Sequence, residues 1–335
     1  MTAALGQTAA QGQAAALGQA AALGLLDPES YTPHALHSSD RIWGETNCYV
    51  DVLIELLHSL GLEPNAINAY LLAADFEGDQ WTFVKPPPED LRRLYGIEIA
   101  ELNVWRPVLD HLTEQLDLGR LITVEVDAFH LPDTRGVAYG LDHVKTTIVP
   151  ADLDLGRRRL GYFHNAGFYR VDGADFDALL EVPEDPRRLP PYVEVIKFAG
   201  PHRDPDQLRD IARGLVDDYL ARQPLDNPVL RLGERITADL DWLVEADMET
   251  FHRYAFGTCR QSGATAELLA DFVTWLYGAD ASAAAFRAAA EAARALQFNL
   301  ARAVRHRRYD VTTPLTGMAT AWETAMGLLR ESHGR

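Results

Sequence analysis

The sequence predicts an α+β fold followed by an all-α helical domain. Residues 48–120 combine helical periodicity with turn residues. Residues 121–171 are β-branched and aromatic and alternate in polarity, whereas residues from about 204 to 330 are apolar at helical spacing. Helices that precede an antiparallel sheet, rather than alternating with its strands, indicate α+β.

Composition limits the classes of partner. The chain has 335 residues, and its hydrophobic content of 47% is enough for one large or two ordinary domains. A net charge of -18 argues against nucleic acid or an anionic membrane as the main partner. No apolar run approaches the roughly 18 residues that span a bilayer. The start lacks the pattern of a secretory signal, and the two cysteines have no disulfide or metal-binding spacing, so we expect a cytoplasmic protein without a metal site.

Three segments follow from changes in composition. Residues 1–24 repeat an uncharged Ala- and Gly-rich unit, which predicts a disordered tail; a start codon assigned too early would explain the same stretch. We expect an α+β domain over residues 25–203 and a helical domain over residues 204–335. The Pro-rich and charged stretch 181–206 marks the boundary between them.

The first domain begins with helices. Thr46 or Asn47 can cap a helix whose apolar residues recur up to Leu60, with Asp51 on its more polar face. Pro64 is placed to open a second helix. Residues 86–120 predict two more short helices.

Strands and then further helices complete the prediction. Residues 121–131, 143–154 and 158–171 predict strands of an antiparallel sheet, because turn residues separate them. In the helical domain we expect helices over residues 206–223, 232–256, 265–278 and 281–304.

Cys48 is the first candidate for chemistry. It falls in the first turn of the predicted helix, where free N–H groups and the helix dipole stabilise a thiolate. Asp51, one turn later, opposes this effect. A half-buried, inert thiol is the alternative.

A nucleophilic cysteine needs a base and a group that orients the base. Strand alternation puts His143, Lys145 and Thr147 on one face. The next strand can bring His164 or Asn165 beside His143, and an Asn amide oxygen can fix the tautomer of a His ring. A core histidine bonded to a backbone carbonyl is the alternative.

The motifs resemble known families. Cys48, a later His on a strand and an Asn in "HNAGF" resemble the papain-like cysteine enzymes. The stretch "GRLITVEVDAFHLPDTRGVAYGLDHVKTTIV" is similar to butirosin-biosynthesis H-type acyltransferases and bacteriocin-leader peptidases. After Leu25 the chain resembles an uncharacterised bacterial family, numbered 1839 among domains of unknown function, in "ETNCYVD", "DFEGDQWTF", "YGIEIAELNVWRP", "DAFHLPDT", "GYFHNAG" and "HRYAFGTCRQSGA".

The resemblance implies a papain-like first domain with Cys48 as nucleophile, His143 as base and Asn165 as orienting residue. Papain-like enzymes carry an oxyanion-stabilising Gln about six residues before the cysteine, where this chain has Ile42. The Asn47 side chain or the Trp43 indole would have to assist the backbone N–H of the cysteine.

Other polar residues are candidates for substrate binding. Glu125 and Asp127 share a strand face and could hold a substrate ammonium or pair with a basic side chain of the protein. Lys145 could bind a carboxylate or phosphate, or extend from the sheet edge into solvent. The remaining candidates are Glu45, Asp51, His164, Arg260 and Gln261. Capping and domain contacts are the alternative for Arg260 and Gln261, and Cys259 is expected to be structural.

The resemblance further implies transfer of an acyl or aminoacyl group from a carrier-protein thioester to a small amine acceptor. No cofactor is expected beyond the phosphopantetheine arm of the carrier. An acidic carrier would need a basic surface, for which Arg157–Arg159 and Arg302–Arg308 are the candidates. The alternatives are a cysteine amidase or peptidase on the same residues, and a non-catalytic binding module on the same scaffold.

Overall fold

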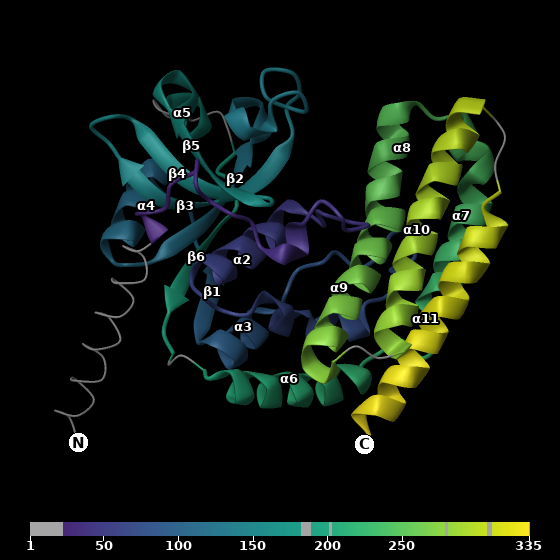
Figure 1. Ribbon diagram of the computed structural model, residues 1–335. Coiled ribbons are helices and arrows are strands. Elements are labelled where there is room, and N and C mark those ends of the chain that lie inside the picture. The colour runs from purple at the N-terminus through teal and green to yellow at the C-terminus, as the bar shows by residue number, and fades with distance from the viewer. Residues whose placement is uncertain (1–22, 182–188, 201–202, 279–280, 307–309, 335) are drawn as a thin grey trace. The chain divides into compact units, whose positions relative to one another are not determined.

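The computed structural model describes residues 23–181, 189–200, 203–278, 281–306 and 310–334 (Figure 1). The tail predicted at residues 1–24 therefore lies outside the described residues, except for its last two. The chain divides into two compact units. Of the described residues, the sheet unit comprises those up to His37, Asn47–Pro64 and those within Pro87–Arg203, and the helical unit comprises Ser38–Thr46, Asn65–Pro86 and those from Asp204 onward.

The sheet unit contains a six-stranded antiparallel sheet, with strand order β1-β6-β2-β3-β4-β5. Its strands are β1 (Ile97–Glu101), β2 (Leu121–Asp127), β3 (Lys145–Asp154), β4 (Arg159–His164), β5 (Gly167–Asp172) and β6 (Val193–Phe198). The helical part of the chain follows, so the α+β prediction is confirmed.

Two of these strands were not predicted, and the single strand predicted at residues 158–171 is a hairpin of β4 and β5. β1 lies in a stretch predicted to be helical, and β6 lies in the predicted domain boundary. β1 and β6 pair with each other but lie far apart in the chain. The residues around either strand therefore do not reveal its partner. Gly96 and Gly200 allow the close approach at one end of this pair, because a Cβ atom on Gly96 would lie 2.5 Å from the Gly200 Cα.

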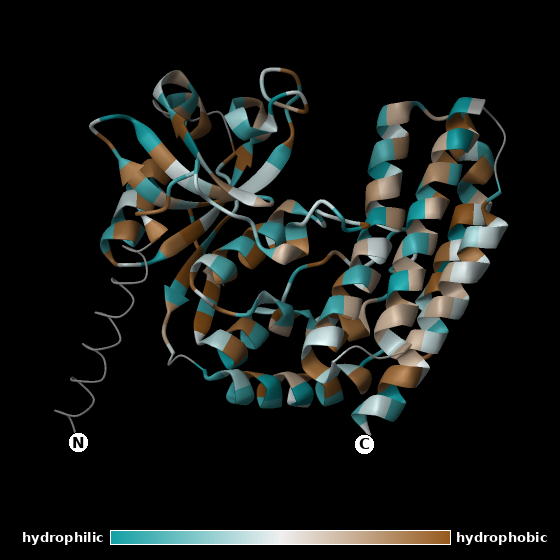
Figure 2. Cartoon of the chain, in the orientation of Figure 1, coloured by the Kyte–Doolittle hydropathy of each residue, from teal (hydrophilic) through white to brown (hydrophobic). Residues whose placement is uncertain are grey.

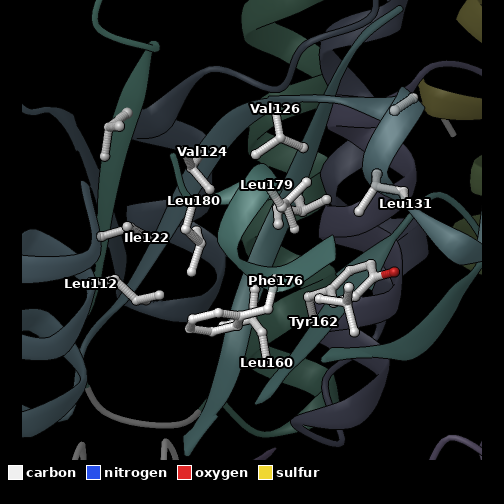
Figure 3. Close-up of a cluster of buried hydrophobic side chains, with 14 of the residues drawn as sticks. Leu112, Ile122, Val124, Val126, Leu131, Leu160, Tyr162, Phe176, Leu179 and Leu180 are labelled. Carbon is white, nitrogen blue, oxygen red and sulfur yellow. The ribbon is translucent and has the colours of Figure 1, made fainter. Parts of the chain in front are cut away.

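Helices surround this sheet. They are α2 (Cys48–Ser59), α3 (Pro88–Tyr95), α4 (Val108–Asp117) and α5 (Gly173–Leu179), with short 3-10 turns η1 (Ala35–His37), η3 (Ala128–His130) and η4 (Pro132–Thr134). Leu112 of α4 and Phe176 of α5 pack with Ile122, Val124 and Leu160 in a buried apolar cluster (Figure 3). Each buried side chain of this size stabilises the fold by roughly 1.5–3 kcal/mol.

The helical unit contains most of the 3-10 helix η2 (Pro64–Ala73), then α6 (Pro205–Leu220), α7 (Pro228–Glu245), α8 (Met248–Ala255), the π-helical turn η5 (Phe256–Arg260), α9 (Gln261–Tyr277), α10 (Ala281–His306) and α11 (Thr312–His333). Hydrophilic and hydrophobic residues are interspersed along these helices (Figure 2). The rings of Trp81 and Phe286 contact Trp322 edge-on in its core. No helix of the described chain is long and apolar enough to cross a bilayer.

The face of α2 that was predicted to be polar is buried. Asp51 and Glu55 are at most 1% exposed, because the preceding segment covers them. His37 of η1 bonds to Glu55 through Nδ1, and its Nε2 lies 3.4 Å from Asp51. The Tyr31 hydroxyl also donates to Glu55, at 2.5 Å. One imidazolium therefore compensates two buried carboxylates.

The pKa values agree with a charged cluster. Burial alone would lower the pKa of His37, but its bonds to Asp51 and Glu55 raise it to about 9. Burial alone would raise the pKa of Glu55, but hydrogen bonds from His37 and Tyr31 lower it. His37 is thus protonated and Glu55 ionised at neutral pH.

We expect His37→Gln to lower the free energy of unfolding by about 3–5 kcal/mol, because it leaves buried carboxylates without a cation. The loss should depend on pH. The pKa of folded His37 is about 9, above its reference value of 6.5, so the stabilisation is full below pH 6.5 and is lost as the pH rises to about 9. Denaturant titrations from pH 6 to 10 measure both effects.

His58→Gln is the matched control, because the His58 ring, on the same helix as the two carboxylates, bonds a backbone carbonyl, that of Thr32. It should cost less than about 1 kcal/mol and keep the pH dependence of the wild type. An unchanged pH profile in His37→Gln would contradict the assigned charge.

Candidate functional site

Cys48 is the first residue of α2 and is half-buried. Asn47, in an extended conformation, is the N-cap: its side-chain oxygen accepts hydrogen bonds from the N–H groups of Tyr49 and Val50 at 3.0 and 3.1 Å. The thiol therefore lies in the turn where the helix dipole favours negative charge, as the sequence predicted. The Cys48 thiol donates a hydrogen bond to the hydroxyl of Thr147 in β3, at 3.6 Å.

Polar side chains from β2 and β3 share the sheet face of Thr147. In the strand register Glu125 pairs with Thr147 and Asp127 pairs with Lys145. Paired residues of antiparallel strands project to the same side, so these four side chains and the Cys48 thiol lie over one face. The Lys145 ammonium donates to Glu125 at 2.5 Å.

His143, just before β3, forms a dyad with Asp127. Its Nδ1 atom lies 2.5 Å from the Asp127 carboxylate, and its ring stacks on Phe129 at 4.5 Å and 10°. The His143 side chain is 71% exposed. Partial burial alone would raise the pKa of Asp127, but hydrogen bonds from His143 and the Phe129 N–H hold it below its usual value. The ionised carboxylate can therefore accept a hydrogen bond from Nδ1–H, which leaves Nε2 as the nitrogen that can take up a proton.

The described contacts do not join Cys48 to His143. The thiol contacts Thr147, and His143 precedes Thr147 by four residues, which corresponds to ~13 Å along a strand. The two candidates share one side of the sheet without touching. Thr147 is a neighbour of the thiol that sequence reasoning did not select, although the predicted alternation already put it on the face of His143.

Asn165 lies in the hairpin between β4 and β5 rather than beside His143. His164 pairs with Gly167, so Asn165 and Ala166 form the two-residue turn. Asn165 has φ of +44°, a left-handed conformation that Asn and Gly adopt most readily. The hydrogen-bond partner of His143 is instead Asp127, which the sequence selected only for substrate binding.

His164 is buried on the opposite side of the sheet. Its ring nitrogens lie 2.6 Å from the Asp133 carboxylate and 2.8 Å from the Thr146 hydroxyl. Asp133 also accepts from Tyr162 at 2.5 Å. Burial raises the pKa of that tyrosine, and the charge and hydrogen bond of Asp133 raise it further. Thr146 and Thr147 are adjacent in β3 and project to opposite faces of the sheet. These hydrogen bonds therefore connect residues 131–135 to β4 on the face away from Cys48.

The remaining candidates hold the segment 41–46 within the helical unit. Arg260 donates to the Thr46 carbonyl at 3.1 Å and pairs with Glu45 at 3.6 Å. Gln261, which is buried, donates to the same carbonyl at 3.3 Å. The Trp43 indole N–H donates to the Ala290 carbonyl at 3.1 Å and is thus committed to that acceptor.

Burial leaves the second cysteine with no evident role in chemistry. Cys259 lies fully buried in the π-helical turn η5. Burial raises the pKa of its thiol to about 12, so it remains protonated at neutral pH. This agrees with the structural role expected from the sequence.

The hairpin geometry predicts different effects of two substitutions at Asn165. Asn165→Gly should leave the free energy of unfolding within ~0.5 kcal/mol of wild type, because Gly adopts φ of +44° freely. Asn165→Ala should lower it by about 1 kcal/mol, because the Ala Cβ atom is strained there. Chemical denaturation measures both. Equal losses in the two variants would show that the Asn side chain itself matters.

Comparison with known proteins identifies the family. The family model described as the DUF1839 N-terminal domain matches residues 32–198, and the one described as the DUF1839 C-terminal domain matches residues 205–331. No curated protein matches the chain. The resemblance to papain-like enzymes stays a prediction. The two matches cover most of the chain, one after the other, and the chain therefore belongs to the DUF1839 family.

Proposed function

We propose that the protein transfers an acyl or aminoacyl group from a carrier-protein thioester to an amine, through an acyl thioester on Cys48. One observation carries the proposal: a His143–Asp127 dyad with an exposed imidazole lies on the same sheet face as a thiol in the first turn of a helix. In this proposal Asp127 takes the orienting role that the sequence assigned to Asn165.

The reaction has two balanced steps. The Cys48 sulfur attacks the thioester carbonyl, the bond from carbon to the carrier sulfur breaks, and His143 passes the thiol proton to the departing carrier thiolate. The acceptor amine then attacks the acyl-Cys48 carbonyl and loses a proton to His143, which protonates the released Cys48 thiolate. The products are an amide and the free carrier thiol.

The reaction requires two further features of the protein: donors for the negative oxygen and an imidazole close to the thiol. The negative oxygen formed at the carbonyl needs donors, for which the Cys48 N–H and the Asn47 side chain are the candidates in place of Trp43. The imidazole must also approach the thiol when substrate binds. High exposure of His143 is compatible with such a movement, and catalytic hydrogen bonds often form only in the substrate complex.

A non-catalytic binding module is the second candidate. It is favoured by the contact of the Cys48 thiol with Thr147 rather than with His143. A cysteine amidase or peptidase would use the catalytic residues with water as the acceptor.

Intact-mass analysis after incubation with acyl and aminoacyl carrier thioesters tests the transfer. We expect one acyl adduct on the wild type and none on Cys48→Ser. His143→Ala should form the adduct about 10²–10⁴-fold more slowly, because the proton transfer loses its base. Asp127→Asn should also slow it, because the dyad loses its charge.

Cys259→Ala is the matched control and should form the adduct at the wild-type rate, since its thiol is buried and protonated. An adduct that persists in Cys48→Ser would refute the assigned nucleophile. No adduct from any carrier thioester, together with retained binding, would favour the binding module.

The carrier is proposed to dock on α10 rather than on Arg157–Arg159. Arg157, Arg158 and Arg159 each pair with an Asp side chain of the sheet unit. Arg302 and Arg305 of the other cluster are exposed on α10, while Arg307 and Arg308 lie outside the described residues.

Reversing both charges, in Arg302→Glu/Arg305→Glu, should raise KM for carrier-bound substrate several-fold and leave a small synthetic thioester unaffected. Steady-state kinetics with the two substrates measure this. Arg157→Glu/Arg159→Glu is the control on the other cluster. Equal effects of the two double variants would contradict docking on α10.

A further inference from the structure

The sheet unit contains a cavity of about 350 Å³ beside the His143–Asp127 dyad. β6 begins at Val193, opposite Val124, so β2 continues past the start of its neighbour. The cavity lies at this end of β2, and residues from both faces of the strand line it, together with the end of α5. We propose, on the basis of the proposed acyl transfer, that this cavity binds the apolar, uncharged chain of the transferred acyl group.

One wall of the cavity is hydrocarbon. Val124, Val126, Leu179 and Leu180 form it, and Figure 3 shows these four side chains close together in the sheet unit. All four are nearly buried, so the wall belongs to the core and is not an exposed patch. An apolar chain gains by leaving water at this wall, whereas a charged group would lose its hydration and find no partner there.

The rim of the cavity is polar, and two of its carboxylates are bonded to basic side chains of the protein. Glu125 holds Lys145, and Asp127 holds His143. The structure thus shows the carboxylates bonded to basic side chains of the protein, one of the two alternatives that the sequence left open. A substrate ammonium at Glu125 or Asp127 would have to displace the partner of that carboxylate. The rim therefore favours the polar thioester end of a substrate, not a charged end group.

The cavity is within reach of the thiol. Lys145 lines the cavity, and Thr147, which contacts Cys48, lies two residues further on the same face of β3. Two residues of a strand span ~7 Å, so an acyl group with its carbonyl at Cys48 can extend over Lys145 to the rim of the cavity. Val124 and Val126 project to the opposite face, so the chain must pass the edge of β2, beyond the start of β6, to reach them. The volume is near the lower end for ligand pockets, which suits an acyl chain and excludes a folded peptide.

Two thioesters of equal chain length test the chemistry of this wall. Hexanoyl and 6-aminohexanoyl N-acetylcysteamine thioesters differ only in a terminal charge. We expect the hexanoyl thioester to acylate Cys48 at least ~10-fold faster, measured by intact mass over time. Equal rates, or a faster aminohexanoyl thioester, would overturn the proposal.

A substitution that fills the cavity tests its position. Ala178 of α5 lines the cavity and is only half-buried, so Trp can replace it without crowding the core. Ala178→Trp should slow hexanoyl transfer at least ~10-fold and leave acetyl transfer within ~2-fold. Ala174→Trp, on the exposed side of the same helix, is the matched control and should change neither rate. If Ala178→Trp left hexanoyl transfer unchanged, the acyl chain would lie elsewhere.

Equilibrium binding separates this proposal from the proposed function. Hexanoyl-N-acetylcysteamine should bind Cys48→Ala, measured by calorimetry, and Ala178→Trp in that background should abolish binding. Such binding without any adduct on the wild type would support the cavity and refute acyl transfer. Adducts that form at rates independent of Ala178→Trp would support transfer and overturn the cavity. Absence of both binding and adducts would overturn both proposals.

Discussion

The two carboxylates buried on α2 are the constraint on which the candidate site depends. Asp51 and Glu55 lie on the helix that begins with Cys48, and His37 provides the cation that stabilises both of these buried carboxyl groups. The cluster ties η1 to α2. A negative charge on Asp51, one turn from the thiol, would oppose a thiolate on Cys48. The His37 imidazolium offsets such a charge.

The sheet distributes polar groups between its two faces. Thr147 and Glu125 belong to the face of Cys48, whereas Thr146 and His164 belong to the face with the apolar core. A shift of one residue in the register of β3 would exchange these roles. Tyr162, Asp133 and His164 oppose such a shift, because their hydrogen bonds connect β4 to the loop before β3.

The sequence was informative where local pattern determines structure. A cap at Thr46 or Asn47, the strand β3 and the helical C-terminal region follow from neighbouring residues, and the structure confirms them with Asn47 as the cap. It failed where the cause lies far away along the chain. β1 forms because β6 pairs with it about 100 residues later, and Asp51 is buried because His37 folds back on it. Likewise, the orienting partner of His143 is set by the pairing of β2 with β3, which local pattern alone does not reveal.

The segment 38–46 determines whether the chain can be cut into two fragments that fold separately. Glu267 of α9 accepts hydrogen bonds from the backbone N–H groups of Ile42 and Trp43, at 2.9 and 2.8 Å. The segment thus belongs to the helical unit, although Cys48 follows it within two residues in the sheet unit. A gene cut between the two family matches would leave these N–H groups in one fragment and their acceptor in the other. The two halves named by the family models are therefore not independent modules, and they can be expected to be inherited and expressed as one chain.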